Sequence, residues 1–161
     1  MTTATPERQP DVSLRDVEEA DLPILFEHQL DPEANRMGAF KPRSREAFVA
    51  HWATVLRDET VVKKAVLVGG EVAGNVVSFE RDGEREVGYW IAREHWGKGV
   101  ATQALSQLLK LVTERPLYAY VAKRNVASLR VLQKCGFEIV KELRPPPEAD
   151  YNVEEYVLVL R

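Results

Sequence analysis

The sequence predicts an α/β protein of the α+β kind, with a mixed, mostly antiparallel central sheet of about seven strands and four helices on both faces. Residues 63–92, KKAVLVGGEVAGNVVSFERDGEREVGYWIA, hold three strand-like runs separated by two glycine-bearing turn signals, the pattern of an antiparallel meander. A strand, a crossover helix and a further strand follow over residues 86–121, an order that favours parallel pairing of the fourth and fifth strands.

The elements before the meander are a short strand and two helices. Residues 12–15 are expected to form the first strand, and residues 18–30, EEADLPILFEHQL, a helix with an apolar side. Residues 31–44 carry two prolines and a glycine, and we expect a long loop there. The second helix is expected to begin at Ser44, a capping residue that precedes apolar side chains at helical spacing.

After the meander, the spacing of apolar residues changes from that of strands to that of a helix. The remaining elements are expected to be a helix over 100–112, a strand over 117–121, a helix over 125–136 and strands over 137–143 and 153–160. Pro116 ends the first of these helices, and Gly136 closes the second as a left-handed cap.

The composition is that of a single globular domain. A length of 161 residues fits one domain over residues 11–161, after a polar tail over residues 1–10 that we expect to be mobile. The net charge of -3 gives no general nucleic-acid footprint, and no apolar stretch is long enough to span a bilayer. With Cys135 as the one cysteine there is no internal disulfide, and a cytoplasmic location without nucleic-acid or membrane partners is expected.

The segment HWGKGVATQAL, residues 95–105, places Gly97 and Gly99 where a helix should begin. A glycine-rich turn into a helix exposes several backbone N–H groups at the positive end of the helix dipole, a site suited to an anion such as a pyrophosphate. Lys98 either adds attraction or points to solvent. The dinucleotide pattern G-x-G-x-x-G is absent because Thr102 stands at the third glycine, so the turn alone is equally compatible with a purely structural role.

Two longer motifs resemble a known family. GYWIAREHWGKGVATQAL, residues 88–105, resembles the acetyl-CoA-binding motif of the GNAT superfamily of N-acetyltransferases, Gln/Arg-x-x-Gly-x-Gly/Ala. Gly99 and Ala101 match its last two fixed positions, and Trp96 replaces the Gln/Arg. NVASLRVLQKCGFEIV, residues 125–140, resembles the helix–strand segment that follows. The combination is most similar to the branch that contains the ribosomal-protein N-terminal acetyltransferases.

This resemblance implies a GNAT-like fold and acetyl-CoA as co-substrate. It implies that the pyrophosphate binds to the backbone of Trp96, Gly97, Lys98, Gly99, Val100, Ala101 and Thr102. It further implies that the edge of the strand at Tyr89, Trp90 and Ile91 pairs with the pantetheine arm and that a backbone N–H there faces the thioester carbonyl. The alternative for these three residues is sheet core. Asn125 is expected to cap the following helix, to touch the pantetheine with its amide, or both.

Acetyl transfer to an amine also needs a base and help for the departing thiolate. The resemblance implies that Ser128 assists the thiolate, either as an acid or through a hydrogen bond. For the base we predict Glu86, with Glu80 as the second choice. Strand alternation places Glu86 on one face with Glu84 and Trp90 if no bulge intervenes. The alternative is that the three glutamates are solvated charges at the strand edge.

Other side chains are assigned more weakly. Arg124, Arg130 and Lys134 either meet the 3′-phosphate of the co-substrate or are solvated helix charges. Phe40 and Trp52 either border the acceptor site or pack in the core, and core packing is the better interpretation. Cys135 is expected in the core. The three histidines have no partner at ligand spacing, so no metal is expected.

The leading hypothesis is an acetyl-CoA-dependent N-acetyltransferase. It would transfer acetyl to a primary amine, either a protein N-terminal α-amine or a small molecule, by direct attack on the thioester. The alternatives are a non-catalytic acyl-CoA-binding module of the same fold, a nucleotide-binding protein of another kind, and a structural module. We expect a monomer or a homodimer.

Overall fold

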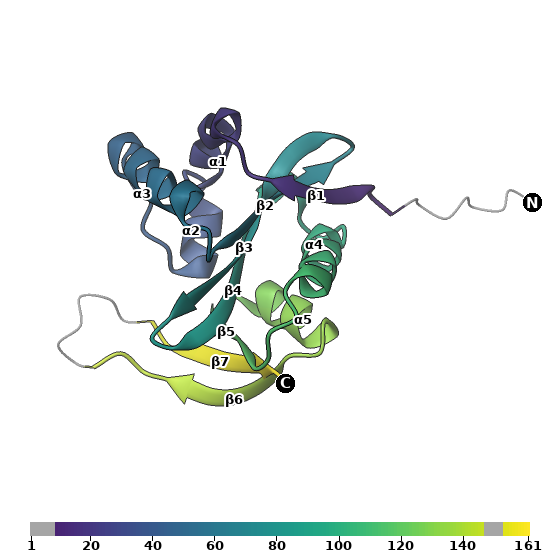
Figure 1. Ribbon diagram of the computed structural model, residues 1–161. Coiled ribbons are helices and arrows are strands. Elements are labelled where there is room, and N and C mark those ends of the chain that lie inside the picture. Colours follow the sequence, from purple (N-terminus) through teal and green to yellow (C-terminus); the bar gives the residue numbers. More distant parts are fainter. Residues whose placement is uncertain (1–8, 147–152) are drawn as a thin grey trace, which may run out of the picture.

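The computed structural model describes residues 9–146 and 153–161, so most of the expected mobile tail lies outside the described residues. A seven-stranded sheet with the order β1-β2-β3-β4-β5-β7-β6 runs through the molecule (Figure 1). The elements are β1 (Val12–Asp16), η1 (Glu19–Asp21), α1 (Leu22–His28), α2 (Pro32–Gly38), α3 (Arg45–Arg57), β2 (Val62–Val68), β3 (Glu71–Arg81), β4 (Glu84–Ile91), η2 (Arg93–His95), α4 (Val100–Leu111), β5 (Leu117–Ala122), α5 (Val126–Lys134), β6 (Glu138–Leu143) and β7 (Glu155–Leu160).

The helices cover the two faces of the sheet in two groups. Figure 1 shows α1, α2 and α3 on one side and α4 and α5 on the other. The larger core cluster joins α4 and α5 to the sheet and includes the fully buried Leu105, Leu108 and Leu158. The smaller cluster joins α1 and α3 to the opposite face through Phe26, Phe48 and related side chains. The predicted mixed, mostly antiparallel sheet between helices is therefore confirmed.

The first half of the chain differs from the prediction at one element. The segment 31–44, expected to be a loop, contains α2, which makes five α-helices rather than four among the described residues. Asp31 caps this helix by accepting a hydrogen bond from the Glu33 N–H at 3.1 Å, and Pro32 occupies the first helical position. Proline is well suited to that position, because the N–H it lacks would have no helical partner there. The expected helix over 18–30 also divides, into η1 and α1.

The central hairpins agree with the predicted meander. β2, β3 and β4 pair antiparallel in chain order, and the β3–β4 register runs without interruption from Gly74↔Ile91 to Arg81↔Glu84. The uninterrupted register places Glu84, Glu86 and Trp90 on one face of β4, as predicted. Tyr89 consequently points to the other face, where α4 and α5 lie.

The parallel pairing of β4 with β5 is confirmed, but it is short. It includes the register pairs Arg85↔Leu117 and Glu86↔Tyr118, and beyond them residues 87–91 of β4 and 119–122 of β5 both line a cavity. The strands thus diverge toward their carboxyl ends, and β4 presents backbone groups there that the sheet does not pair. This divergence opens the sheet at the point where the glycine-rich turn leaves β4.

Within the described ranges 9–146 and 153–161, none of the helices combines the length and apolar character that crossing a membrane requires.

Candidate active site

The glycine-rich turn leads directly into α4. Gly97 and Gly99 both adopt left-handed backbone conformations, with φ of 73° and 79°, and no atom beyond the adjoining residues lies within 4 Å of where a Cβ would stand. Gly99 is the N-cap of α4 and offers no side chain to the first helical N–H groups. The N–H groups of Val100, Ala101 and Thr102 therefore remain available at the positive end of a 12-residue helix. This arrangement fits a pyrophosphate that approaches the backbone closely.

Trp96 anchors this turn to the end of β4. Its indole Nε1–H donates to the Ile91 carbonyl oxygen at 2.8 Å, and its ring packs against the larger core cluster. Trp96, which replaces the Gln/Arg of the family pattern, thus makes a structural contact. It holds the turn in place, and the groups that face a ligand are those of the backbone.

One cavity joins the turn to the gap between β4 and β5. Its volume is about 540 Å³, which falls in the ordinary range for small-molecule sites. Its lining comes from α2, β4, the turn, β5 and α5 and includes these predicted residues: Tyr89, Trp90, Ile91, Trp96, Gly97, Gly99, Val100, Ala101, Thr102, Asn125 and Ser128. Glu86 and Lys98 do not line it. The predicted cofactor-binding residues are thus brought together, with the exception of the Lys98 side chain.

Asn125 and Ser128 stand at the start of α5. Asn125 is the N-cap, and its Oδ1 accepts from the Ser128 N–H at 3.2 Å. The capping role is therefore observed, and the Nδ2 amide of Asn125 remains for a ligand. The Ser128 Oγ lies 2.6 Å from the phenol oxygen of Tyr89, a contact that no sequence pattern predicted.

Glu86 is 4% exposed and lies on the opposite face of β4 from Tyr89. Arg81 holds its carboxylate through two parallel hydrogen bonds, with Nε to Oε2 at 2.8 Å and Nη2 to Oε1 at 2.9 Å. Burial raises the pKa of Glu86 above its ordinary value, and the charge and hydrogen bonds of Arg81 oppose that shift. A carboxylate has about four lone-pair positions, so the Arg81 fork leaves acceptor capacity on both oxygens.

The neighbouring carboxylates have different surroundings. Glu84 accepts a hydrogen bond from the Tyr120 hydroxyl at 3.0 Å, and burial together with that bond raises the pKa of Tyr120 to about 12. Glu80 pairs with Arg85 in the β3–β4 register, which places its side chain on the face opposite Glu86, and it is exposed. Because residues that pair directly share a face, Glu80 is not near the Glu86 carboxylate.

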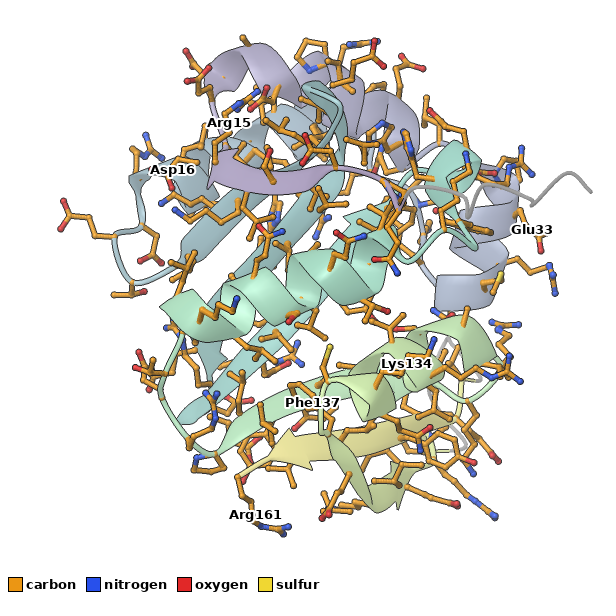
Figure 2. The ribbon with its side chains drawn as sticks, turned by 90° about the vertical axis from the view of Figure 1, so that its right-hand side faces the viewer. Arg15, Asp16, Glu33, Lys134, Phe137 and Arg161 are labelled. Carbon is orange, nitrogen blue, oxygen red and sulfur yellow. The ribbon has the colours of Figure 1, made fainter. Side chains whose placement is uncertain are left out.

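Two of the three cations predicted on or just before α5 reach the cavity. Arg130 and Lys134 line it, whereas Arg124 is exposed outside it. Figure 2 shows α4 and α5 side by side on this face, with Lys134 on α5 and Phe137 just beyond the end of that helix. An anion held at the start of α4 would therefore have positive charge on the neighbouring helix.

The two aromatic residues with alternative roles, Phe40 and Trp52, lie in different places. Phe40 lines the cavity and meets Trp90 edge-on with ring centroids 5.1 Å apart. Trp52 is 6% exposed and packs from α3 into the smaller core cluster. Cys135 is partly buried against the larger core cluster, and burial raises the pKa of its thiol, as suits an inert core residue. In the described part of the chain, no three His, Cys, Asp or Glu side chains come together as metal ligands would.

Comparison with known proteins shows the family to which the chain is similar. The model of the acetyltransferase (GNAT) domain matches residues 11–138. The "Uncharacterized N-acetyltransferase p20" of Bacillus licheniformis is 26% identical over 141 residues, which cover 79% of this chain and 79% of that protein. The "Putative ribosomal N-acetyltransferase YdaF" of Bacillus subtilis is 30% identical over 100 residues, 58% of this chain and 55% of that protein.

Solved structures extend the similarity to the fold. The spermidine N-acetyltransferase of Vibrio cholerae, in complex with CoA and spermine, superposes with a TM-score of 0.79 at 18% identity. The match covers 92% of this chain and 94% of that one. The two proteins therefore share a fold over most of both chains.

Proposed function

This chain belongs to the GNAT family of acetyltransferases, and we propose that it transfers the acetyl group of acetyl-CoA to a primary amine by direct attack of the amine on the thioester. The observation that carries the proposal is the single cavity that joins the uncapped start of α4 to the gap between β4 and β5. A phosphate-bearing ligand and an extended thioester arm fit these two parts in sequence.

Each part of the cavity supplies one binding requirement. The backbone from Trp96 to Thr102 receives the pyrophosphate, since the N–H groups at the start of α4 have no capping side chain and the helix dipole favours negative charge. The free edge of β4 at residues 89–91 pairs with the pantetheine arm as an added strand would. A backbone N–H on that edge then stabilises the negative charge that develops on the thioester oxygen.

Glu86 is proposed as the base that takes the proton of the amine. It does not line the cavity, whereas its neighbours Val87 and Gly88 do, so the proton reaches the carboxylate through a water molecule. Its raised pKa makes it a stronger base than an exposed glutamate, and Arg81 holds it in one orientation. An α-amine, with a pKa of roughly 7.7–8.0, needs less help than a lysine-like amine at roughly 10.4.

Ser128 is proposed to face the sulfur as the carbon–sulfur bond breaks. It stands in the first turn of α5 on the cavity wall, and the Asn125 cap fixes its backbone. The 3′-phosphate of the co-substrate is assigned to Arg130 and Lys134, the two α5 cations that reach the cavity.

The acceptor is proposed to be a protein N-terminus or a small amine. The similarity to YdaF supports the first, and the likeness to the spermine-bound spermidine N-acetyltransferase supports the second. Either would enter on the face of α2, where Phe40 and Trp90 line the cavity.

The test is product detection by mass spectrometry after incubation with acetyl-CoA and a panel of N-terminal peptides, polyamines and other small amines. Acetylation of one class in proportion to time and protein concentration supports the proposal and identifies the acceptor. Glu86→Gln is the internal control, because it removes the base and retains the cavity lining. Equal product with and without the protein across the whole panel would contradict it.

A further inference from the structure

A pair of hydroxyl groups crosses the cavity from β4 to α5. Tyr89 sends its side chain from the diverging part of β4 to the first turn of α5, where its phenol oxygen meets two atoms of Ser128. The hydroxyl oxygens lie 2.6 Å apart, and the Ser128 carbonyl oxygen lies 3.2 Å from the phenol. Both residues line the cavity, and the Asn125 cap holds the Ser128 N–H. Ser128 is therefore held at its backbone N–H and its hydroxyl, and the single phenol hydrogen goes either to the Ser128 carbonyl oxygen or to its Oγ.

The direction of the short hydrogen bond decides what Ser128 can do. If the serine donates to the phenol, the phenol hydrogen goes to the Ser128 carbonyl oxygen at 3.2 Å, and no serine hydrogen remains for a ligand. If the phenol donates to the serine Oγ, the serine hydrogen is free to point into the cavity. An anion in the cavity favours the second arrangement, because it attracts the free hydrogen and polarises both hydroxyls in the same direction. The phenol is also the more acidic of the two hydroxyls and hence the better donor.

We propose that Tyr89 is a positioning residue for the departing thiolate, because its phenol donates to Ser128 Oγ and so turns the serine hydrogen toward the sulfur. This inference rests on the proposed function. When the carbon–sulfur bond breaks, its electron pair stays on sulfur, and the thiolate is stabilised by the hydrogen bond from Ser128. The amine proton leaves toward Glu86, and the thiolate takes its own proton later from solvent.

The two hydroxyls act by hydrogen bonding and keep their protons. Burial raises the pKa of Tyr89 to about 12, although its hydrogen bond with Ser128 opposes the shift. A free thiol has a pKa of roughly 8.5, so transfer of the phenol proton to the thiolate is unfavourable by several powers of ten. Ser128 therefore acts as a hydrogen-bond donor that Tyr89 orients, and it does not act as an acid.

The test measures the thiol pKa of bound CoA and needs no acceptor amine. Thiolate absorbance is followed against pH in the CoA complex, and the desulfo-CoA complex is subtracted to cancel Cys135 and the tyrosines. We expect the parent to lower the pKa of the bound thiol by about one unit, a factor of about ten in the equilibrium. Tyr89→Phe and Ser128→Ala should each return it toward the free value, and the double variant should match Ser128→Ala alone.

Tyr118→Phe is the matched control, because that hydroxyl belongs to β5 but its residue does not line the cavity. It should leave the bound thiol unchanged. Rates should follow the same order, with kcat of Tyr89→Phe reduced about 10- to 100-fold and KM for acetyl-CoA changed less than about twofold. Thermal unfolding checks that the variants remain folded.

The outcomes separate this inference from the proposed function. A parent protein that does not bind CoA overturns the proposed function and this inference with it. A parent that binds CoA, with the same thiol pKa in Tyr89→Phe as in the parent, overturns the inference alone. A shift in Tyr89→Phe without one in Ser128→Ala also overturns it, since Tyr89 would then act without the serine.

Discussion

Replacing Gly99 by alanine should separate the ligand-binding role of the turn from its structural role. Gly99 has a φ of 79°, where an L-residue is strained by roughly 1–2 kcal/mol. No atom beyond the adjoining residues lies within 4 Å of the added Cβ, so the strain is conformational and involves no clash with the rest of the protein. In a chain of this size that destabilisation lowers Tm by roughly 2–8 °C. The Cβ would also stand where a pyrophosphate approaches the helix N-terminus.

The expected loss of CoA affinity is larger than the strain alone explains. A hydrogen bond to a charged group contributes about 1.5–3 kcal/mol, so losing one raises Kd for CoA roughly 10- to 150-fold. Gly83→Ala is the matched control: Gly83 has a φ of 80°, equally open surroundings, and a place in the β3–β4 turn outside the cavity. Calorimetric titration with CoA and thermal unfolding are compared for both variants. If both variants lose the same Tm and Gly99→Ala keeps the CoA affinity of the parent, the phosphate-binding interpretation is refuted.

Glu86→Gln should lower kcat about 100-fold or more while CoA affinity changes less than about twofold. In the parent, the acidic limb of the kcat/KM profile should lie above the ordinary glutamate pKa of about 4.3, because the protonated side chain accepts no proton. A parent-like rate of the variant would exclude Glu86 as the base. Lys134→Ala and Arg130→Ala should each weaken CoA binding about 2- to 5-fold and leave the binding of dephospho-CoA unaffected, with Arg124→Ala as the control outside the cavity. Equal losses of affinity for CoA and dephospho-CoA would place the 3′-phosphate elsewhere. Asp21→Asn should lower the free energy of unfolding by about 1–2 kcal/mol at neutral pH, since the hydrogen bonds from Arg15 hold the pKa of Asp21 below its usual value. This stabilisation is present above the pKa of Asp21 in the unfolded chain and is lost as pH falls through its pKa in the folded protein. Urea unfolding curves of variant and parent that still differ at strongly acidic pH would contradict this prediction.

The order of the elements could be predicted because most of their signals are local. The turns at Gly69-Gly70 and Asp82-Gly83, the Ser44 cap and the Gly136 cap all lie where the sequence predicted them. The sequence pattern did not predict α2, because proline is typical of a loop, whereas Pro32 follows the capping Asp31 and begins a helix. The same residue type favours a loop in one context and a helix start in another, and only the neighbouring cap distinguishes them.

The site was predictable in its backbone and less so in its side chains. The resemblance led to the turn at residues 96–102 and to Asn125, which the structure gathers around one cavity. The Glu86–Arg81 pair could have been found from the two-residue turn, which sets the hairpin register and places Arg81 diagonally across from Glu86. The Tyr89–Ser128 contact joins residues 39 positions apart, and it depends on the divergence of β4 from β5, for which the sequence carries no local signal.

The central claim is that the cavity between β4 and β5 binds acetyl-CoA and passes its acetyl group to an amine. The most direct test is calorimetric titration of the protein with acetyl-CoA, followed on the same sample by free-thiol release in the presence of the acceptor panel. We predict saturable binding at one site per chain and thiol release that depends on one class of amine. Absence of binding, or binding with no amine-dependent release across the panel, would contradict the claim.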